Sequence, residues 1–345
     1  MTTYRQLQGY RIKKVDGDPS NLKEGQIWYN NSAKAIKGQY VVAASWASGG
    51  NLNTARGRIS LSSVGTQTAA LCVGGFVPDT KTGKAEEYNG SSWTESGDLN
   101  TPRYWLGACG TQTAGLGFGG YTLPGQTVNT EEYNGSSWTE TGNLASVRYG
   151  HDGCGTQTAA VSIGAGTYSV PEGFARSGVV EEYDGSSWTA GNSIAPALTP
   201  PPQSGINNQA CVGTQTAGLT IGGATPGVAA TTQCLEYDGT NFANGGALPS
   251  GIINGQGGGI QTSAFVCGGH NPAVGSYFTA THLYDGSSWS TSPATLATGT
   301  QNGSGAGTTT AGITYGGFKS GSPAYVNETQ EFTGEVINTN TFDVS

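Results

Sequence analysis

A short glycine-anchored phrase returns six times along the chain, and no other feature limits the possible folds as strongly. Its copies begin at Gly65, Gly110, Gly155, Gly213, Gly259 and Gly307, so successive steps are 45, 45, 58, 46 and 48 residues. A period of this length is typical of repeat architectures such as propeller blades and solenoid units. Each copy is therefore expected to form one supersecondary unit.

The best-preserved copies predict four short strands per unit. Residues 110–120 read GTQTAGLGFGG and residues 131–142 read EEYNGSSWTETG. Five copies contain Asn-Gly or Asp-Gly, which favours a tight type I′ hairpin because both residues tolerate positive φ. A Tyr precedes the dipeptide, and a Trp follows three residues after the Gly in four copies, with Phe242 in the fifth. Aromatic residues on both sides of a turn suit strands that pack against the next sheet.

A second hairpin is predicted where GTQT leads into an apolar strand. This strand ends in Gly-Gly in five copies, for example Gly119-Gly120, and in Gly164-Ala165 in the third copy. Paired glycines at a strand end fit a crowded inner position where side chains would collide.

These features resemble the Kelch repeat, whose blade carries Gly-Gly after its second strand, a Tyr on the third and a Trp on the fourth. Residues 148–151, RYGH, are similar to the Arg-x-x-His opening of many Kelch blades, although the other copies lack the His. The resemblance covers roughly residues 40–345. It implies an all-β fold, a six-bladed Kelch-like β-propeller with a short N-terminal segment. It implies no particular activity, because Kelch propellers serve many unrelated functions.

Closure of the ring is expected from residues 45–56, which repeat the end of a blade (residues 92–103) before any blade has begun. An orphan fourth strand there would complete the last blade, whose earlier strands come from residues 307–332, and would remove an open edge. The tail, residues 335–345, also has the pattern of a strand. It either adds an outer strand or competes for the same place, and the sequence leaves both open.

Composition argues against several classes of partner. Only 11% of residues are charged and 58 of 345 are Gly, which would suggest disorder if the repeat were absent. The net charge of −8 is spread without acidic runs and argues against nucleic acid or an anionic membrane as partner. No apolar stretch of membrane-spanning length and no secretory signal are present, so we expect no membrane insertion and folding in a cytoplasm.

The cysteines are expected to be buried structural thiols. Cys109 and Cys154 occupy a position where other copies have Val, Gly or Ala, and Cys72 and Cys267 lie among apolar neighbours. Interchange with small apolar residues is typical of free thiols. Disulfides rank second, and metal binding ranks third because no Cys-x-x-Cys pair exists.

The first 38 residues differ from the rest of the chain. They contain nearly half of the 15 basic residues of the whole sequence: Arg5, Arg11, Lys13, Lys14, Lys23, Lys34 and Lys37. Residues 25–31, GQIWYNN, predict a short aromatic strand that runs into a turn.

This opening resembles the N-terminal segment of appendage proteins of tailed bacteriophages, especially marine ones, in which a similar phrase precedes Kelch-like GTQTA repeats. The resemblance implies a virion component, assembled in the host cytoplasm and present in multiple copies per particle. Residues 1–38 would then anchor it to other virion proteins, and residues 39–345 would form an outward-facing propeller. The alternative is that residues 1–38 form only an extra hairpin on the propeller rim.

A binding surface is expected at one end of the propeller. In a four-stranded blade the second turn and the link to the next blade lie on one face, and this face carries most of the length variation, for example in residues 166–178 and 195–208. Variable loops on a rigid ring are suited to recognition. The candidate ligand-binding residues, whose aromatic and amide groups suit stacking on sugars, are Tyr121, Tyr168, Phe174, His270, Asn271, Tyr277 and Phe278. The alternative is that these loops only cover the propeller end.

The sequence gives less support to an enzymatic function. Copper oxidation needs His and Tyr ligands that converge on the axis, but His151, His270 and His282 stand in different registers, so neither a metal nor another cofactor is expected. Doublets such as Glu86-Glu87 could suggest the paired carboxylates of glycosidases. They repeat with the blade, however, and successive strand residues point to opposite sides, so we interpret them as blade-to-blade hydrogen bonding.

The sequence thus favours a non-enzymatic phage virion protein, a tail or fibre component that binds host surface glycan through the variable face. One alternative is a purely structural virion protein, either a capsid decoration or a tail adaptor. A carbohydrate-active enzyme is the third hypothesis.

Overall fold

The structure, a computed structural model, describes residues 12–21, 23–61, 64–169, 173–200, 203–320 and 324–342. Arg5 and Arg11 of the predicted anchoring segment lie outside these residues. The chain divides into two compact units. Unit 1 comprises Met1–Ala44 with Gly334–Ser345, and unit 2 comprises Ser45–Thr333.

Unit 2 contains, within its described residues, six four-stranded antiparallel sheets, one for each copy of the repeat, and we call each sheet a blade. Blade 1 has β5 (Gly65–Thr66), β6 (Ala69–Val73), β9 (Ala85–Tyr88) and β10 (Trp93–Glu95), and blade 2 has β11 (Gly107–Thr111), β12 (Ala114–Phe118), β13 (Thr130–Tyr133) and β14 (Trp138–Glu140). Blade 3 has β15 (Asp152–Thr156), β16 (Ala159–Ser169), β17 (Gly173–Tyr183) and β18 (Trp188–Ala190), and blade 4 has β19 (Ala210–Thr214), β20 (Ala217–Ile221), β21 (Cys234–Tyr237) and β22 (Phe242–Asn244). Blade 5 has β23 (Gln256–Ile260), β24 (Ser263–Cys267), β27 (Ala280–Tyr284) and β28 (Trp289–Thr295), and blade 6 has β30 (Ser304–Gly307), β31 (Ala311–Tyr315), β33 (Thr329–Thr333) and β4 (Ser45–Ser48).

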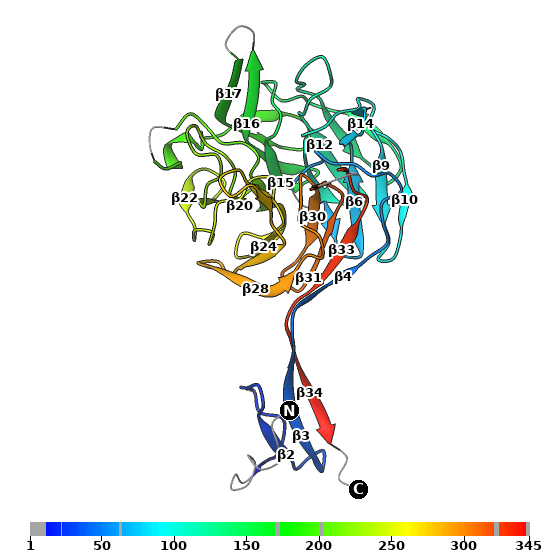
Figure 1. Ribbon diagram of the computed structural model, residues 1–345, viewed down its shortest axis with the longest axis vertical. Coiled ribbons are helices and arrows are strands. Elements are labelled where there is room, and N and C mark those ends of the chain that lie inside the picture. Colours follow the sequence, from blue (N-terminus) through cyan, green and yellow to red (C-terminus); the bar gives the residue numbers. More distant parts are fainter. Residues whose placement is uncertain are drawn as a thin grey trace. The chain divides into compact units, whose positions relative to one another are not determined.

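The first strands of the blades contact one another in a closed circle, in the order β5, β11, β15, β19, β23, β30 and back to β5. Figure 1 shows the blades arranged around this centre. A ring of radially arranged antiparallel sheets is an all-β propeller, as the repeat predicts.

The ring closes through β4, which pairs antiparallel with β33, so that Trp46 lies opposite Phe332. This confirms the expected orphan strand. The tail does not compete for that place, because β34 (Val336–Phe342) pairs with β3 (Ala35–Val42) in unit 1. The predicted boundary after residue 38 therefore differs from the structure: β3 continues to Val42, and its partner β34 brings the end of the chain into the same sheet.

The hairpin between the third and fourth strands differs from the predicted type I′ turn. Only the glycine has positive φ, for example +89° at Gly135, whereas Asn134 does not. The Asn134 side chain instead accepts hydrogen bonds from the backbone N–H groups of Ser136 and Ser137, both at 3.0 Å. The Asn or Asp of this motif is therefore needed for its side-chain acceptor rather than for a left-handed backbone.

Within the described residues, the hydrophobic core is divided into six clusters, one at each boundary between consecutive blades. The boundary between blades 2 and 3, for example, buries Leu116, Phe118, Tyr183 and Trp188. All six cysteines are buried and free, as expected. The cluster between blades 5 and 6 is the smallest, with Phe265, Cys267 and Leu296 as its buried members and Trp46 and Leu283 packed against them.

Two repeated polar contacts hold each of blades 1 to 5 to the blade that precedes it in the ring. The Gln of the GTQT phrase donates to two backbone carbonyls of the preceding blade; Gln112 Nε2, for example, lies 3.2 Å from Ala70 O and 2.6 Å from Tyr88 O. The repeated Tyr donates its hydroxyl to the second Glu position of the preceding blade, as in Tyr133 to Glu87 at 2.5 Å. Burial, reinforced by the Glu87 carboxylate, raises the pKa of Tyr133 to about 12. The blade-to-blade role predicted for the second Glu is therefore confirmed.

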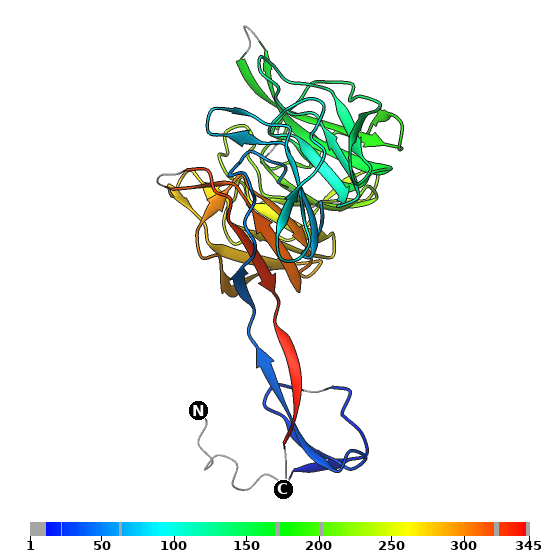
Figure 2. The ribbon, with the colours of Figure 1, turned by 90° about the vertical axis from the view of Figure 1, so that its right-hand side faces the viewer.

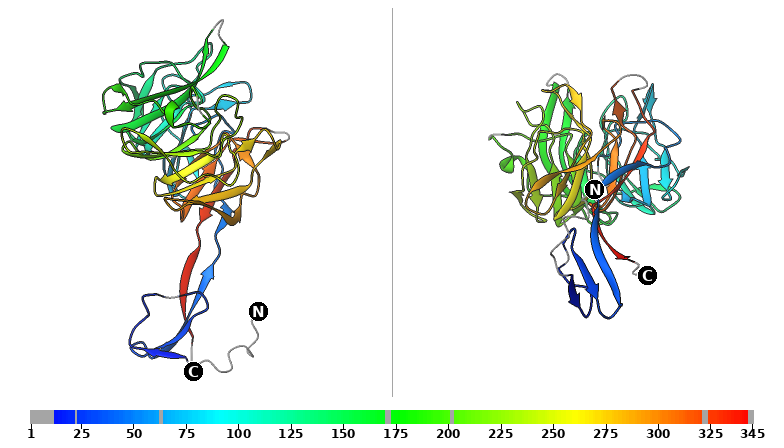
Figure 3. Two further views of the ribbon diagram at one scale, coloured as in Figure 1. Left: turned by 90° about the vertical axis from the view of Figure 1, so that its left-hand side faces the viewer. Right: turned by 60° about the horizontal axis from the view of Figure 1, so that its bottom comes forward.

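Unit 1 is a sheet in the order β1 (Lys13–Val15), β2 (Ile27–Asn30), β3 and β34, and the ribbon of β3 and β34 is seen in Figure 3. β2 is the strand predicted from GQIWYNN. Its polar contacts centre on Asp18, which accepts hydrogen bonds from Trp28 Nε1 at 3.0 Å and Asn30 Nδ2 at 2.6 Å. Lys37 Nζ lies 2.7 Å from the other oxygen of Asp18 and lowers the pKa of that carboxyl.

The loops of unit 2 carry short additional pairs: β7 (Phe76–Val77) with β8 (Thr80–Lys81), β25 (His270–Asn271) with β26 (Ser276–Tyr277), and β29 (Thr300–Gln301) with β32 (Phe318–Lys319). A 3-10 helix spans Ala195–Ala197. β16 and β17 extend past their neighbours as a projecting hairpin, drawn in green at the top of Figure 2. Among the described residues, no helix has the length and apolar character needed to cross a membrane.

Candidate functional site

The links between blades lie at the same end of the propeller as the turns between the second and third strands. Single antiparallel residue pairs outside the strands show this. A residue of each link pairs with the residue that follows the second strand, as in Gly57 with Phe76, Tyr104 with Tyr121, and Ile253 with His270. We call this end the loop face. It is the face on which the sequence places the candidate binding residues.

At the centre of the loop face, six equivalent residues just before the innermost strands form what we call the axial ring: Arg58, Trp105, Gly150, Asn208, Asn254 and Asn302. Each residue has a left-handed backbone, with φ between 52° and 59°. From Trp105 to Asn302, the N–H of each donates to the carbonyl of the preceding ring residue at 2.7 to 3.1 Å. The fold therefore requires positive φ at all six positions.

Two of the six ring residues are poorly suited to that backbone. Gly and Asn adopt positive φ at low cost, whereas a bulky side chain there costs on the order of 1 kcal/mol or more. Four blades use Gly or Asn, but Arg58 and Trp105 do not fit this preference. Strain of this kind at the mouth of a ring points to a requirement for the two side chains themselves.

Arg58 lies over a group of aromatic rings. Its guanidinium carbon is 4.6 Å from the ring centroid of Trp105, 5.1 Å from that of Phe76 and 5.6 Å from those of Tyr104 and Phe318. Cation–π contacts of this kind hold the side chain in place without using its N–H donors. Among the described residues, none forms a hydrogen bond or ion pair with the Arg58 side chain, so its donors are available to a ligand.

The rings continue around the loop face as a connected aromatic arc: Phe76, Tyr104, Trp105, Tyr121, Tyr149, Phe174, Phe318 and Tyr325. Trp105 stacks on Tyr149 with a centroid distance of 5.5 Å and an interplanar angle of 27°. Tyr121 contacts Tyr104 and Tyr149, each at 5.5 Å. Burial raises the pKa of both Tyr104 and Tyr149, so their hydroxyls stay neutral and serve as hydrogen-bonding groups.

The other side of the ring carries amides, which we call the amide arc: Asn207, Asn208, Asn254, Gln301 and Asn302. Trp105 Nε1 donates to Asn302 Oδ1 at 3.2 Å and so joins the two arcs. Asn254 Nδ2 donates to Gln301 Oε1 at 3.2 Å, while Asn254 Oδ1 is buried without a hydrogen-bond partner among the described residues. Amides beside aromatic faces provide the two kinds of contact that a sugar ring needs, hydrogen bonds for its hydroxyls and a flat apolar surface for its C–H groups.

The sequence-predicted site residues fall into three groups. Tyr121 and Phe174 belong to the aromatic arc, and Tyr168 faces Phe174 across the β16–β17 hairpin, with exposed fractions of 54% and 45% for Tyr168 and Phe174. His270, Asn271 and Tyr277 lie together in the β25–β26 hairpin. Phe278 packs against the core cluster between blades 4 and 5.

The β25–β26 hairpin borders a cleft of about 520 Å³ lined by His270, Gly275, Tyr277, Thr298, Gly299 and Ser320. The cleft lies beside the link that enters blade 6. His270 forms one wall, with its ring 5.3 Å from that of Tyr277 in an edge-to-face arrangement.

Comparison with known proteins identifies a similar fold and no related sequence family. No family model matches the sequence, and no curated protein matches it. Among solved structures, YjhT has a similar fold, with a TM-score of 0.64 and 16% sequence identity over 84% of this chain and 99% of that chain. YjhT is a β-propeller. At this identity the likeness supports the propeller fold alone.

The histidines do not come together. His151 is buried against Phe118, His270 lies in the cleft, and His282 is bonded to Thr291 at 3.1 Å. Burial lowers the pKa of all three. In the described part of the chain, no group of three or more His, Cys, Asp or Glu residues is arranged to hold a metal ion.

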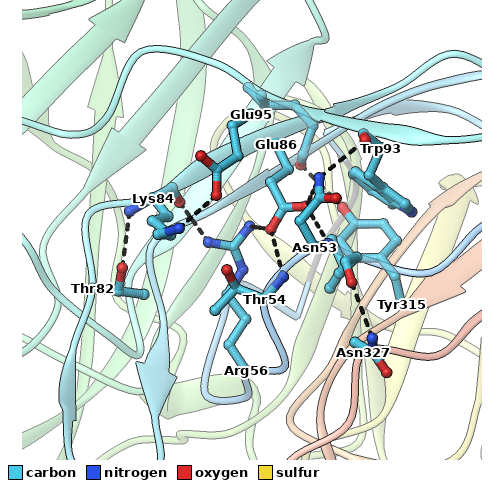
Figure 4. Close-up of polar contacts among 12 residues, drawn as sticks. Asn53, Thr54, Arg56, Thr82, Lys84, Glu86, Trp93, Glu95, Tyr315 and Asn327 are labelled. Atoms are coloured by element: carbon cyan, nitrogen blue, oxygen red, sulfur yellow. Dashed lines mark hydrogen bonds and ion pairs between the residues drawn. The ribbon is translucent and has the colours of Figure 1, made fainter.

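The first Glu of each doublet is committed to the links between blades. Figure 4 shows Arg56 and Glu86 directed toward each other, with Nη2 and Oε1 2.8 Å apart and both side chains fully buried. Asn53 and Thr54 donate backbone N–H groups to the same carboxylate at 2.7 and 3.3 Å. Arg103–Glu131 and Arg148–Glu181 repeat the pair in blades 2 and 3. These carboxylates therefore join the links to the blades and organise the fold.

Sequence reasoning missed the axial ring, because its six positions share no residue type. Spacing could have found it: in blades 2 to 6 the ring residue stands five positions before the Gly of the repeated phrase. At that place Trp105 is the only residue that is neither Gly nor Asn.

Proposed function

We propose that this protein is a non-enzymatic carbohydrate-binding propeller whose axial ring and aromatic arc engage glycan at the loop face. The observation that carries the proposal is the presence of Arg58 and Trp105 at left-handed positions where four other blades have Gly or Asn. A backbone that accepts strain at two neighbouring blades, while keeping the Arg58 donors unengaged, is best explained by a ligand that needs both side chains.

The chemistry of the surroundings favours sugars. The aromatic arc offers ring faces for C–H groups, and the amide arc offers both donors and acceptors for hydroxyls. The repeated carboxylates are committed to Arg and Tyr side chains, so the pairs that suggested hydrolysis do not serve this surface.

We further propose that the protein is a tail or fibre component of a tailed bacteriophage, with host surface glycan as ligand. Support comes from the sequence: the GQIWYN phrase followed by GTQTA repeats resembles phage appendage proteins. Unit 1 would then attach the chain to other virion proteins. It has its own sheet and its own polar centre at Asp18, as an attachment unit requires.

The test is glycan binding by the full chain and by Arg58→Asn, measured on an array of bacterial surface polysaccharides. Asn suits the left-handed backbone, so the variant removes the guanidinium without disturbing the ring. We expect at least a tenfold loss of affinity. Lys34→Asn is the matched control, because Lys34 is also a basic residue with φ of 55° but lies in unit 1.

Two results would contradict the proposal. Absence of binding to any glycan, with folded protein, would favour a structural virion protein whose loop face docks another protein. Turnover of a bound polysaccharide into shorter products would favour the enzymatic alternative.

A further inference from the structure

The cleft beside β25 and β26 is separate from the aromatic arc and has a different chemistry. Its polar side chains are the ring nitrogens of His270 and the hydroxyls of Tyr277, Thr298 and Ser320. Among the described residues, none forms a hydrogen bond with these four side chains. These four hydrogen-bonding groups line one cavity and are available to a ligand.

Two glycines line the cleft. At Gly299, a Cβ atom would lie 2.7 Å from the carbonyl oxygen of Tyr277, so any larger residue would push the hairpin away. At Gly275, the backbone has φ of 66°, and no atom lies within 4 Å of the Cβ position. The cavity of about 520 Å³ falls in the size range of small-molecule sites.

The cleft is also electrically neutral. None of its described lining residues is acidic or basic apart from His270, and burial lowers the pKa of that imidazole, which keeps it uncharged near neutral pH. Lys319, the neighbour of Ser320, is paired with Glu328 at 3.1 Å. An anionic ligand would therefore find no counter-charge here, whereas hydroxyls would find both donors and acceptors.

We propose that this cleft is a second sugar subsite, which takes a neutral, hydroxyl-rich sugar ring of the same glycan that the axial ring binds. The inference rests on the proposed function. Continuity between the two sites comes from the bridge between Ile253 and His270, because Ile253 directly precedes Asn254 of the axial ring. The perpendicular rings of Tyr277 and His270 provide an aromatic wall for the C–H face of the sugar.

The experiment uses the full chain on an array of neutral, uronic-acid-containing and sulfated oligosaccharides, with apparent affinities from protein titration. The test variant carries Tyr277→Phe, Thr298→Val and Ser320→Ala, which remove three hydroxyls and keep the shape of the cleft. Loss of two or three ligand hydrogen bonds predicts an affinity reduced by about tenfold or more. The control variant carries Tyr40→Phe and Thr139→Val, which remove hydroxyls from exposed strand residues of unit 1 and blade 2.

Binding of a neutral glycan that the cleft variant weakens, and that the control variant does not, supports the proposal. Unchanged binding by the cleft variant, together with loss of binding by Arg58→Asn, overturns the subsite and leaves the proposed function intact. Binding restricted to acidic or sulfated glycans overturns the neutral specificity alone. Absence of all glycan binding overturns both the subsite and the proposed function.

Discussion

At the scale of single residues, the axial ring separates what the fold requires from what a ligand requires. Each blade needs a left-handed residue at the same point, and Gly150, Asn208, Asn254 and Asn302 meet this need cheaply. Because the six positions are equivalent, the chain provides its own internal comparison. Ring residues other than Gly or Asn, which adopt positive φ at a higher energetic cost, are candidates for function.

Arg58→Asn is predicted to leave the free energy of unfolding within about 1 kcal/mol of wild type. Relief of the left-handed strain gains roughly 1 kcal/mol, and loss of the cation–π contacts costs about the same. Trp105→Asn should instead lose about 2 kcal/mol or more, because its stacking on Tyr149 is removed. Urea unfolding followed by circular dichroism measures both. A large loss for Arg58→Asn would mean that the arginine is structural.

His151 is predicted to make stability depend on pH between about 5 and 6.5. Burial, and secondarily the nearby charge of Arg148, lowers the pKa of this imidazole well below its ordinary value. At a pH below about 6.5, the unfolded pKa, the imidazole is protonated in the unfolded chain and stays neutral in the folded chain. The free energy of unfolding therefore falls as pH drops below that value. The His151 contribution to this loss is at most about 2 kcal/mol at pH 5, a limit set by the unfolded pKa. The His151→Leu variant should show a shallower decline over the same range in urea titrations, and an equal slope would exclude His151 as the cause.

At the scale of strands and turns, the repeated phrase is explained by contacts between blades. Gln67, Gln112, Gln157, Gln215 and Gln261 each bridge two carbonyls of the preceding blade. Blade 6 has Thr309 at this position, and Ser263, at 2.9 Å, is the hydrogen-bond partner of its hydroxyl among the described residues. The boundary between blades 5 and 6 therefore lacks the bridge.

Substitutions at this position should act in opposite directions in the two kinds of blade. Gln112→Ala is predicted to cost about 1 to 3 kcal/mol, because two buried carbonyls lose a donor. Thr309→Gln is predicted to gain about 0.5 to 1.5 kcal/mol by supplying the missing bridge to blade 5. Thermal and urea unfolding measure the changes, with Thr113→Ala, an exposed neighbour in the same turn, as control. Destabilisation by Thr309→Gln would show that the blade 5 carbonyls are out of reach.

The same boundary also replaces a polar pair by an apolar one. Every other blade offers a Tyr hydroxyl to a Glu, but blade 6 has Phe332 and blade 5 has Leu283 at the two positions. Leu283→Glu alone should cost about 2 kcal/mol or more, since it buries a carboxylate without its donor. Adding Phe332→Tyr should recover about 1.5 to 3 kcal/mol through a charge-assisted hydrogen bond. A double-mutant cycle measures the coupling, and additive effects would contradict the assigned pairing.

Periodic features of the chain could be predicted from the sequence, and features that do not repeat could not. The blades, the Gly-Gly positions and the orphan strand β4 follow from pattern alone. The predicted type I′ turn was wrong because an Asn-Gly pair is compatible with two turn geometries. In one both residues have positive φ, and in the other the Asn side chain accepts a hydrogen bond from the backbone, as Asn134 does. The position of Arg58 could not be predicted from the pattern, because Arg58 stands seven residues before the Gly of its phrase, whereas the other ring residues stand five before theirs.

At the scale of the whole molecule, closure depends on a strand from the start of unit 2. β4 supplies the last strand of blade 6, and Trp46 packs on Phe332 with a centroid distance of 5.1 Å. Blade 1 then seals against blade 6 through Gln67, which donates to Gly312 O at 3.0 Å and Phe332 O at 2.8 Å. Blade 6 is thus completed by β4 and bound to blade 1 through Gln67. Its boundary with blade 5 has fewer polar contacts.

Removing four residues should therefore destabilise the whole ring. A chain of residues 45–333 should fold and unfold in one cooperative transition, because unit 2 contains every strand of all its blades. A chain of residues 49–333 lacks β4, which exposes the edge of β33 and removes Trp46 from its contact with Phe332. The loss of a packed Trp alone costs about 3 kcal/mol or more, and an exposed strand edge promotes association. Urea unfolding with size-exclusion chromatography measures both effects. Equal stability and monodispersity of the two chains would mean that β4 does not close the ring.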